Sequence, residues 1–360
     1  MNQIGDICRR PACRRGALAV KVVDCPRGAH SFQSDAIERI VVLVFLSGNL
    51  CERIGVESQV KSSVMDAIGN TPVVRLARLF PGADVVAKLE YMNPGGSIKD
   101  RMVRHMLKSL PAGTARVVES SSGNTGAALA MASAVLGLRC DVTVPQSTST
   151  EKMKRIRAYG ATVHPCAPDD GSDPAGGYHA VAERLAQEGD AHYLDQYQSI
   201  LNREAHYLDT GPELWRQLAG EVDVFVCGIG SGGTISGIGR YLKEQRPGVT
   251  VIGVEPSNSA YREAVTATPA TGPFASVVEG VGKRLPSRSF EPGVVDDVVQ
   301  VADDVALDWC RRLAREEGIL AGGSSGCVAA GIAALLPRLA GKRIATVFPD
   351  SGVYYLSKYF

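Results

Sequence analysis

The sequence lacks an excess of charge of either sign, and it lacks a hydrophobic run long enough to cross a bilayer. Its 39 Lys and Arg residues are matched by 38 Asp and Glu, which gives a formal net charge of +1. Such a balance provides no electrostatic signal for a nucleic-acid or membrane partner. The apolar run IVVLVFL at 40–46 is much shorter than the roughly 20 residues of a transmembrane helix, and it lacks the flanks of a secretory signal.

Metal-ligand spacing and a disulfide framework are also missing. The six histidines are never paired at metal-ligand spacing, and the nine cysteines are scattered and odd in number. In a chain of 360 residues this usage is typical of a reduced, cytoplasmic protein. A zinc site built from Cys8, Cys13, Cys25 and His30 is conceivable, but its spacing fits no familiar zinc finger. We therefore expect a cytoplasmic protein without a metal.

Residues 1–64 differ in character from the rest of the chain. Up to His30 they carry six Lys and Arg against two Asp, and a regular pattern begins only at Met65. We interpret this segment as a poorly ordered extension, or as the result of a start codon assigned too early, with Met65 as the true start. We expect no function from it.

From Met65 onward, apolar runs with strand character alternate with segments of helical spacing. Strands are predicted at 85–90, 115–120, 140–145, 161–165, 223–230, 249–256, 296–302 and 343–350. Helices are predicted at 102–110, 127–136, 150–158, 178–187, 235–245, 305–317 and 325–340. This alternation is typical of parallel sheets covered by helices on both faces. Because residues 196–212 are polar and irregular, we place a seam there and predict two α/β domains, at 65–200 and 201–360.

The stretch NPGGSIKDR at 93–101 places a lysine where a strand becomes a helix. A Gly-Gly turn at 95–96 precedes Lys99, and helical spacing follows it. Ligands of open parallel sheets bind at this kind of junction, outside the carboxyl ends of the strands. A solvated lysine needs no such placement, whereas a lysine that forms a covalent bond does. Lys99 is therefore the candidate catalytic residue.

A second junction, GIGSGGT at 228–234, has the composition of a phosphate-binding loop. Glycines allow backbone N–H groups to face inward, and the helix that opens at Ile235 adds its positive dipole end. A dinucleotide fingerprint is the alternative. However, the loop lies two-thirds along the chain, and Glu255, at about the distance expected for the acid, is followed by Pro256. A purely structural glycine turn also remains open.

The third junction, ESSSGNTG at 119–126, gathers small polar side chains before an apolar helix. They are Ser120, Ser121, Ser122, Asn124 and Thr125. One of them would suffice to cap the helix. Five of them, with the free amides of a helix N-terminus, form a receptor for a carboxylate. We favour a substrate-carboxylate site over a cap alone.

The fourth junction, AGGSSGC at 321–327, is a glycine-framed serine pair that by itself indicates a helix cap. Together, the four junctions supply the lysine of 93–101 and a phosphate-binding loop at 228–234, called the phosphate cup. They also supply a carboxylate receptor at 119–126, called the carboxylate cup, and the serine hydroxyls of 321–327. A lysine that forms a Schiff base with an aldehyde cofactor carrying a phosphate describes pyridoxal 5'-phosphate.

These motifs, in this order, resemble the cysteine synthase/cystathionine β-synthase family of pyridoxal-phosphate enzymes of fold type II. The resemblance runs from IGNTPVVRL at 68–76 to FPDSG at 348–352 and includes EGVG at 279–282. It implies a tryptophan synthase β-like fold, in which two parallel-sheet α/β domains hold the active site between them. It also implies a homodimer that acts on small amino-acid substrates.

The resemblance implies roles for individual residues. Lys99 would hold the cofactor through a Schiff base, Asn124 would hydrogen-bond the ring hydroxyl, and Ser324 would face the pyridine nitrogen. The phosphate would be bound by Gly230, Ser231, Gly232, Gly233 and Thr234. The substrate carboxylate would be bound by Ser121, Ser122, Thr125 and Gln196, the last within LDQY.

A serine opposite the pyridine nitrogen favours one class of reaction. A neutral hydroxyl, unlike a carboxylate, does not hold that nitrogen protonated, so a long-lived carbanion is disfavoured and prompt loss of a β-leaving group is favoured. An aminoacrylate forms and a nucleophile adds to it, which is β-replacement. Lys99 would remove the α-proton and return one at the end, and both steps need a neutral amine in a shielded site.

Within the family, several segments resemble the N-(2-amino-2-carboxyethyl)-L-glutamate synthases of siderophore pathways. They include RLFPGADVVAKLEYMNPGGSIKDR, SDPAGGYH at 172–179 and EGILAGGSSG. Those enzymes join O-phospho-L-serine to glutamate on the way to 2,3-diaminopropionate. Lys283 and Arg284 stand where plain cysteine synthases have an apolar stretch. We hypothesise that this basic pair attracts a phosphate leaving group, with a solvated surface pair as the alternative.

Other readings stay open at this stage. The acceptor could be sulfide or another thiol, as in cysteine synthases, and the donor could be O-acetyl-L-serine. The chain could be a non-enzymatic scaffold that binds pyridoxal phosphate, or, on the glycine loop alone, a nicotinamide-dependent oxidoreductase. We expect neither a haem site nor a regulatory module after FPDSGVYYLSKYF.

Overall fold

The computed structural model describes residues 60–121, 123–167, 175–188 and 191–360. The chain divides into two units, Met1–Val60 and Lys61–Phe360, and every element below belongs to the second. The predictions for residues 1–59, including the conceivable zinc site, lie outside the described residues. Within the described ranges, no helix is both long and apolar enough to cross a bilayer, and no cluster of three or more His, Cys, Asp or Glu side chains could hold a metal ion.

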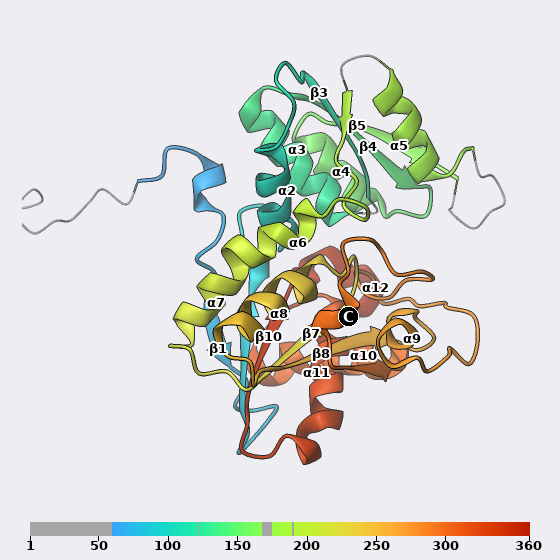
Figure 1. Cartoon of the computed structure of the whole chain (residues 1–360). Coiled ribbons are helices and arrows are strands. Elements are labelled where there is room, and N and C mark those ends of the chain that lie inside the picture. The colour runs from blue at the N-terminus through green and yellow to red at the C-terminus, as the bar shows by residue number, and fades with distance from the viewer. Residues whose placement is uncertain (1–59, 122, 168–174, 189–190) are drawn as a thin grey trace, which may run out of the picture. The chain divides into compact units, whose positions relative to one another are not determined.

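Six strands form the larger sheet, in the order β1-β2-β10-β7-β8-β9 (Figure 1). Their bounds are β1 Val73–Arg75, β2 Asp84–Leu89, β7 Val224–Gly228, β8 Thr250–Pro256, β9 Asp297–Val301 and β10 Arg343–Phe348. β1 runs antiparallel to β2, and all other neighbours are parallel. The sheet thus joins strands that lie far apart in the sequence.

The central strands of this sheet are buried on both faces, as in parallel sheets generally. Along β10, Ile344 and Phe348 pack into one apolar core, while Ala345 and Val347 pack into a second core on the opposite face. The first core includes α10 (Asp303–Glu317) and α11 (Gly323–Leu335). The second includes α7 (Gly211–Gln217), α8 (Gly233–Gln245) and α9 (Tyr261–Thr266).

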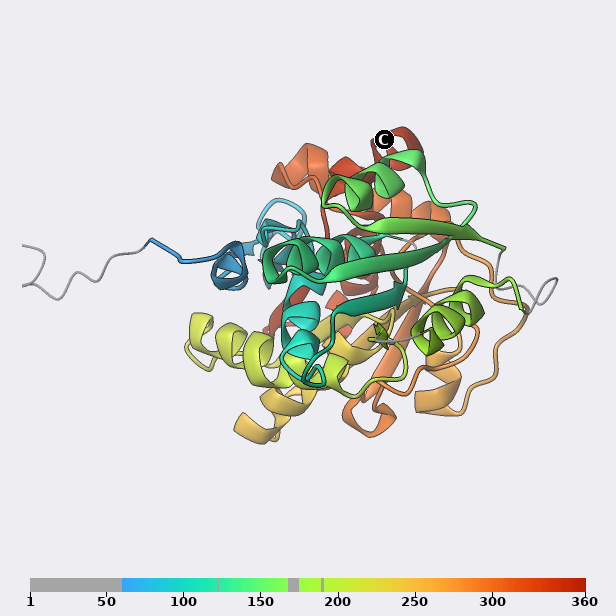
Figure 2. The same cartoon turned by 90° about the horizontal axis from the view of Figure 1, so that it is seen from above.

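Four parallel strands form the smaller sheet, in the order β5-β4-β3-β6. Their bounds are β3 Arg116–Ser120, β4 Arg139–Pro145, β5 Thr162–Cys166 and β6 Ala191–Tyr193. Three helices share an apolar core with these strands: α2 (Lys99–Leu107), α3 (Asn124–Leu136) and α4 (Thr150–Ala158). α5 (Tyr178–Gln187) packs against β3, β4 and β6. Figure 2 shows this sheet from above.

Short helical segments complete the described chain. They are η1 Val64–Ala67, η2 Glu90–Met92, α6 Leu201–Ala205, η3 His206–Thr210, η4 Pro292–Val294, η5 Leu336–Arg338, η6 Gly352–Tyr355 and α12 Leu356–Tyr359.

The predicted α/β class with parallel sheets is confirmed, and every predicted strand and helix is present. β1 and β6 are absent from the prediction because strands of three residues are too short to show a periodic pattern. The boundary at residue 200 stays a prediction. The sheets do not follow it, because β1 and β2 pair with β10 in the larger sheet.

Residues 196–212 are polar and irregular in sequence, but most of them are helical in the structure, and the domain seam placed there stays a prediction. α6, the π-helical turn η3 and α7 follow one another without a break. Buried Asn202, His206 and Thr210 interrupt the apolar periodicity of α6 and η3. Pro212 has no N–H to donate to the preceding turn of this continuous run, and it directly follows Gly211, whose N–H closes the π-helical turn on His206 O.

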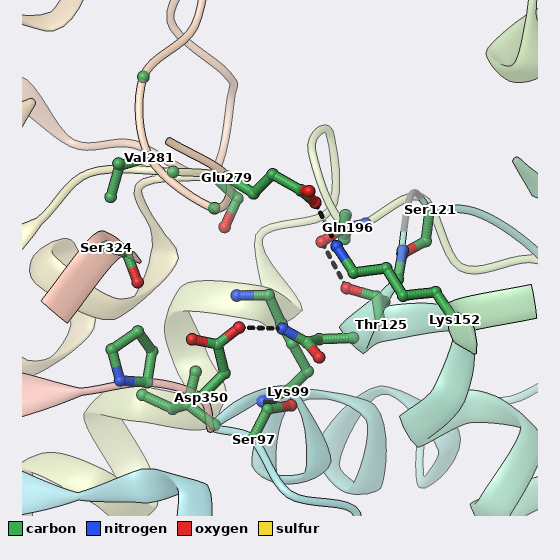
Figure 3. Close-up of a pocket in the computed structure, with 18 of the residues that line it drawn as sticks. Ser97, Lys99, Ser121, Thr125, Lys152, Gln196, Glu279, Val281, Ser324 and Asp350 are labelled. Atoms are coloured by element: carbon green, nitrogen blue, oxygen red, sulfur yellow. Dashed lines mark hydrogen bonds and ion pairs between the residues drawn. The ribbon is translucent and has the colours of Figure 1, made fainter. Parts of the chain in front are cut away.

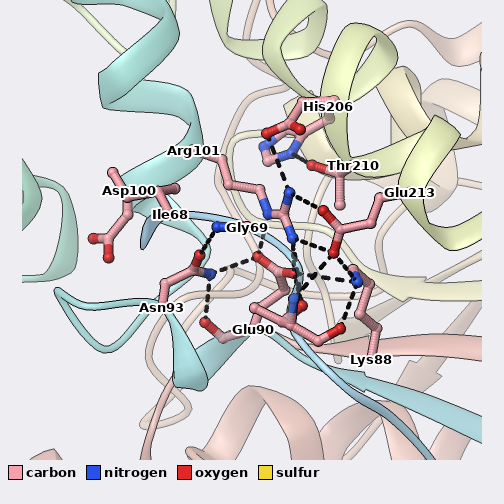
Figure 4. A network of polar contacts seen from close by, with 12 residues as sticks. Ile68, Gly69, Lys88, Glu90, Asn93, Asp100, Arg101, His206, Thr210 and Glu213 are labelled. Atoms are coloured by element: carbon pink, nitrogen blue, oxygen red, sulfur yellow. Dashed lines mark hydrogen bonds and ion pairs between the residues drawn. The ribbon is translucent and has the colours of Figure 1, made fainter. Parts of the chain in front are cut away.

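A buried ion network holds the helix that begins at Lys99 (Figure 4). Arg101 is 1% exposed, and its guanidinium makes two hydrogen bonds of 2.7 Å to Glu90 and two of 2.9 Å to Glu213. The fifth donor lies 3.1 Å from Asp209 Oδ2. All five N–H groups of the guanidinium are therefore used, in the bidentate geometry that makes Arg–carboxylate pairs strong.

Glu213 also connects this network to the stretch GNTP at 69–72. Its carboxylate accepts hydrogen bonds from the backbone N–H groups of Asn70 (3.0 Å) and Thr71 (3.1 Å), and it pairs with the buried amine of Lys88. Burial raises the pKa of Glu213, but the hydrogen bonds and charge of Arg101 outweigh this effect and lower the pKa to about 2. The carboxylate is therefore ionised at neutral pH, and it links α7 to Arg101 of α2 and Lys88 of β2.

Glu213→Gln should lower the free energy of unfolding by about 3 to 5 kcal/mol, because it leaves two buried cations with one carboxylate fewer. Chemical denaturation followed by circular dichroism measures this loss. Glu316→Gln, which breaks a partly exposed pair with Arg312 within α10, is the control and should leave the unfolding curve nearly unchanged. Coincident curves for the two variants would contradict a structural role for the network.

Candidate active site

The four predicted junctions meet at one cavity. Lys99 follows β2, the segment 119–126 follows β3, the glycine loop follows β7, and the serine pair opens α11. All four contribute to a cavity of about 180 Å³ (Figure 3). Its lining includes Lys99, Ser121, Asn124, Thr125, Gln196, Gly230, Ser231 and Ser324. Residues far apart in the sequence are thus assembled outside the carboxyl ends of parallel strands, where such folds bind ligands.

The turn before Lys99 requires its glycines. The Asp100 carboxylate accepts the N–H of Gly95 at 2.6 Å, and a Cβ at Gly95 would lie only 2.3 Å from Asp100 Oδ1. Gly96 has a positive φ of 75°, a conformation that favours glycine. The tight turn therefore fixes where α2 starts, and with it the position of Lys99.

Lys99 is held beside the end of β10, and burial changes the chemistry of its amine. The N–H of Ile98 donates to Pro349 O at 2.8 Å, and Ser97 forms a β-bridge with Asp350. Burial lowers the pKa of the Lys99 amine, while the negative charge of Asp350 opposes this shift. The neutral amine, which attacks aldehydes and takes up protons, is therefore a larger fraction of Lys99 at a given pH than of a solvated lysine.

The glycine loop lines a second cavity of about 40 Å³ that shares Lys99 with the first. Gly230 has no room for a side chain, since a Cβ there would lie 2.2 Å from Gly280 O. Gly233, the first residue of α8, is equally confined, because its Cβ would lie 2.1 Å from Asn202 Oδ1. The first N–H groups of a helix have no partner within the helix. Those of α8 border the cavity, which is the environment that a phosphate needs.

Two side chains of the loop are braced by α6 and η3. Asn202 Nδ2 donates to Ser231 Oγ at 2.9 Å, and His206 Nε2 lies 3.3 Å from Thr234 Oγ1. Burial lowers the pKa of His206 well below its ordinary value, so the ring is neutral, and its Nδ1 lies 2.9 Å from Thr210 Oγ1. The polar inner face of these helices supports the loop. Sequence reasoning missed this role because polar buried residues give no periodic signal.

The residues predicted for the carboxylate cup come together at the start of α3. Thr125 Oγ1 donates to Gln196 Oε1 at 2.8 Å, and Gln196 Nε2 donates to Ser120 O at 3.2 Å. Ser121 is buried, and its Oγ accepts the N–H of Gly123 at 3.2 Å. Ser122 lies outside the described residues. The roles of these groups toward a carboxylate stay predictions.

Asp350 is a cavity residue to which the sequence motifs assign no role. Its Oδ2 accepts hydrogen bonds from Asn124 Nδ2 at 2.7 Å and from the Tyr355 hydroxyl at 2.5 Å. Its Oδ1 is buried and has no hydrogen-bond partner within the described ranges. Burial raises the pKa of Asp350, against the effect of the two donors. Asp350 thus orients the Asn124 amide. Its place in FPDSG, directly after a strand, is the signal that could have identified it.

Lys152 of α4 and Glu279 of the EGVG segment also line the cavity and form an ion pair with each other. The Lys152 side chain is only 7% exposed, which is rare for a lysine. In the sequence it is one of several charged residues on a helix, so nothing distinguishes it from the exposed ones.

Ser324 is buried in the first turn of α11 and lines both cavities. Lys283 lines the larger cavity, with its amine 3.9 Å from the ring centroid of Tyr197. Arg284 is exposed and does not line it. Of the basic pair, we therefore retain only Lys283 as a residue that could attract a phosphate leaving group.

The two adjoining cavities fit a phosphate-bearing aldehyde. Lys99 offers an amine at the point that both cavities share. The confined glycines of the glycine loop at 228–234, called the α8 loop from here on, leave backbone N–H groups for a phosphate. Asn124 and Ser324 offer hydrogen-bonding groups on the cavity wall. This set of groups matches pyridoxal 5'-phosphate.

Comparison with known proteins points the same way. The family model described as "Pyridoxal-phosphate dependent enzyme" matches residues 64–350. Cystathionine beta-synthase of Rattus norvegicus is 39% identical over 309 residues, which are 82% of this chain and 54% of the rat protein. Cysteine synthase B of Pseudomonas aeruginosa is 37% identical over 309 residues, 82% of this chain and 96% of that protein. Cysteine synthase 3 of Caenorhabditis elegans is 38% identical over 295 residues, 78% of this chain and 84% of that protein.

The chain spans about half the length of the curated cystathionine β-synthases that it matches. The predicted relation to cysteine synthases and cystathionine β-synthases is confirmed at the level of the family. A partly buried lysine beside a glycine-lined helix N-terminus, within a sequence matched from residue 64 to 350, leads to one conclusion: this chain belongs to the pyridoxal-phosphate dependent enzymes, and its cofactor is pyridoxal 5'-phosphate.

Proposed function

We propose that this chain catalyses β-replacement on an activated L-serine. The donor is O-phospho-L-serine, with O-acetyl-L-serine as the alternative, and the acceptor is the amino group of L-glutamate. With O-phospho-L-serine, the Cβ–O bond of the donor breaks and a bond from Cβ to the glutamate nitrogen forms. The products are N-(2-amino-2-carboxyethyl)-L-glutamate and phosphate, and the former leads to 2,3-diaminopropionate in siderophore biosynthesis.

One observation carries this proposal: the partly buried Lys99, with a lowered pKa, lines a cavity together with the glycine loop and the start of α3. Lys99 lines both cavities, the smaller one with the α8 loop and the larger one with the start of α3. An amino acid bound by its carboxylate in the larger cavity therefore lies in the same cavity as a proton acceptor. This is what removal of an α-proton requires.

Pyridoxal 5'-phosphate supplies an aldehyde that condenses with amines and a ring that withdraws electrons from the α-carbon. We assign Lys99 to its aldehyde, Asn124 to its ring hydroxyl and Ser324 to its pyridine nitrogen. The phosphate is assigned to residues 230–234, and the substrate carboxylate to Ser121, Ser122, Thr125 and Gln196.

Lys99 moves protons at two points of the reaction. Its neutral amine takes the α-proton of the donor, and the ammonium later returns a proton to the same carbon. The Ser324 hydroxyl is neutral and does not hold the pyridine nitrogen protonated. Charge at the α-carbon is then short-lived, and departure of the β-group is favoured.

The choice of acceptor separates the two candidate functions. The segments that resemble siderophore-pathway synthases support glutamate. Relatives named cysteine synthase support sulfide or another thiol, which makes cysteine synthesis the second candidate. A cytoplasmic, homodimeric enzyme is part of the same proposal, and light scattering after gel filtration tests the dimer.

Purified holoenzyme should convert O-phospho-L-serine and L-glutamate to N-(2-amino-2-carboxyethyl)-L-glutamate, identified by mass spectrometry. O-acetyl-L-serine and sulfide are run in parallel as alternative donor and acceptor. Lys99→Ala should give no product and no borohydride-trapped cofactor, because the amine is lost. Product with sulfide alone would establish the second candidate. No product with any pair would contradict β-replacement altogether.

Lys283→Met should raise KM for O-phospho-L-serine roughly tenfold, because a cation near the leaving group is lost. Arg284→Met, the exposed neighbour, is the matched control and should leave KM unchanged. With O-acetyl-L-serine, neither change should matter. Steady-state kinetics with both donors measure this. Equal effects of Lys283→Met on the two donors would remove Lys283 from phosphate recognition.

Gly230→Ala should weaken binding of pyridoxal 5'-phosphate roughly tenfold or more, because the added methyl forces the α8 loop away from Gly280. Gly248→Ala is the control, since a Cβ there meets nothing within 4 Å. Fluorescence titration of the apoenzyme with the cofactor measures both. Unchanged affinity in Gly230→Ala would show that this loop does not hold the phosphate.

A further inference from the structure

The ion pair between Lys152 and Glu279 joins two segments on different sides of the cavity (Figure 3). Lys152 belongs to α4, which packs with the smaller sheet. Glu279 precedes Val281, which packs in a core of the larger sheet. The pair therefore places opposite charges inside the substrate cavity itself. Neither residue has a role in the proposed reaction so far.

The Lys152 amine lies against the turn that forms the carboxylate cup. A Cβ built on Gly123 would be 3.2 Å from Lys152 Cδ and 3.7 Å from its Nζ. The amine also lies 4.5 Å from the ring centroid of Tyr355. By contrast, the side chains assigned to the cup, such as Thr125 and Gln196, are all neutral. Lys152 is thus a cation at a site proposed to receive an anion.

Glu279 is held from its other side by groups that do not depend on Lys152. Its Oε1 accepts a hydrogen bond from Lys358 Nζ at 3.0 Å, and its backbone N–H donates to the Tyr359 hydroxyl at 3.0 Å. Burial raises the pKa of Glu279, but the charges of Lys152 and Lys358 outweigh this and lower it. Glu279 is therefore a carboxylate at neutral pH, and it keeps a cationic partner when Lys152 turns to another anion.

We propose that Glu279 pairs with Lys152 while no substrate is bound, in the place of the substrate carboxylate. The α-carboxylate of the amino-acid donor then displaces Glu279 from Lys152. Lys152 is then a specificity-determining residue that adds a positive charge to the cup. The exchange also avoids leaving a buried ammonium unpaired between turnovers, which would be costly. The inference rests on the proposed function only in requiring an amino acid in this cavity.

The experiment titrates the holoenzyme with L-alanine, which has no leaving group, and follows the visible absorbance of the bound cofactor. Lys152→Met should raise the Kd for L-alanine roughly tenfold, because a charge-assisted hydrogen bond is lost. Glu279→Gln should lower it about threefold or more, because the competing carboxylate is gone. Lys154→Met, an exposed lysine on the same helix, is the matched control and should leave the Kd unchanged.

L-alaninamide, which lacks a carboxylate, separates this role from a general effect on the cavity. Its Kd should change less than about twofold in both variants, because no carboxylate competes for Lys152. In the K152M background, Glu279→Gln should lower the Kd for L-alanine by less than in the wild type.

Several results would overturn the inference. Glu279→Gln that leaves the Kd for L-alanine unchanged or higher, or that lowers it equally in both backgrounds, would show that the two residues do not compete in this way. So would equal changes for L-alanine and L-alaninamide. The proposed β-replacement fails separately, when L-alanine binds as expected but no activated serine yields product.

Discussion

The structure depends on the pairing of one buried guanidinium with two carboxylates, one nearby in the sequence and one 112 residues away. Arg101 lies two residues after Lys99, and its guanidinium donates hydrogen bonds to the carboxylates of Glu90 and Glu213. Removing these charges from water is costly, and the cost is offset only when all partners are in place. The start of α2 therefore has one well-defined position. The reactive amine inherits that position from an ion network rather than from apolar packing.

The two sheets contribute different parts of the candidate active site. The larger sheet contributes the strand ends that carry Lys99, the α8 loop and Asp350, whereas the smaller sheet contributes the start of α3. In our assignment Lys99 and the α8 loop hold the cofactor, and the start of α3 contributes Asn124 to the cofactor and Thr125 to the substrate carboxylate. The Asn124 amide at the start of α3 donates a hydrogen bond of 2.7 Å to Asp350, which follows β10, so this bond connects the contributions of the two sheets.

Much of this architecture can be predicted from the sequence, because apolar periodicity reports burial directly. α4 and α5 have their predicted bounds at Thr150–Ala158 and Tyr178–Gln187, and Lys99, Thr125 and Gln196 share a cavity as expected. Periodicity fails where the buried face is polar, as in α6 and η3. It also cannot identify a single charged side chain such as Lys152, because its burial depends on a partner 127 residues away. Pairings of this kind are properties of the fold, not of any window of sequence.

The place of β10 in the larger sheet has a consequence for synthesis of the protein. This strand lies between β2 and β7 and is the last strand of the described chain, although it occupies the centre of the sheet. A nascent polypeptide that has not yet emerged to Phe348 presents two open strand edges, on β2 and on β7, with nothing between them. Such edges recruit other chains. The ribosome must therefore deliver the chain as far as Phe348 before the central sheet can close, although β2 emerges more than 250 residues earlier.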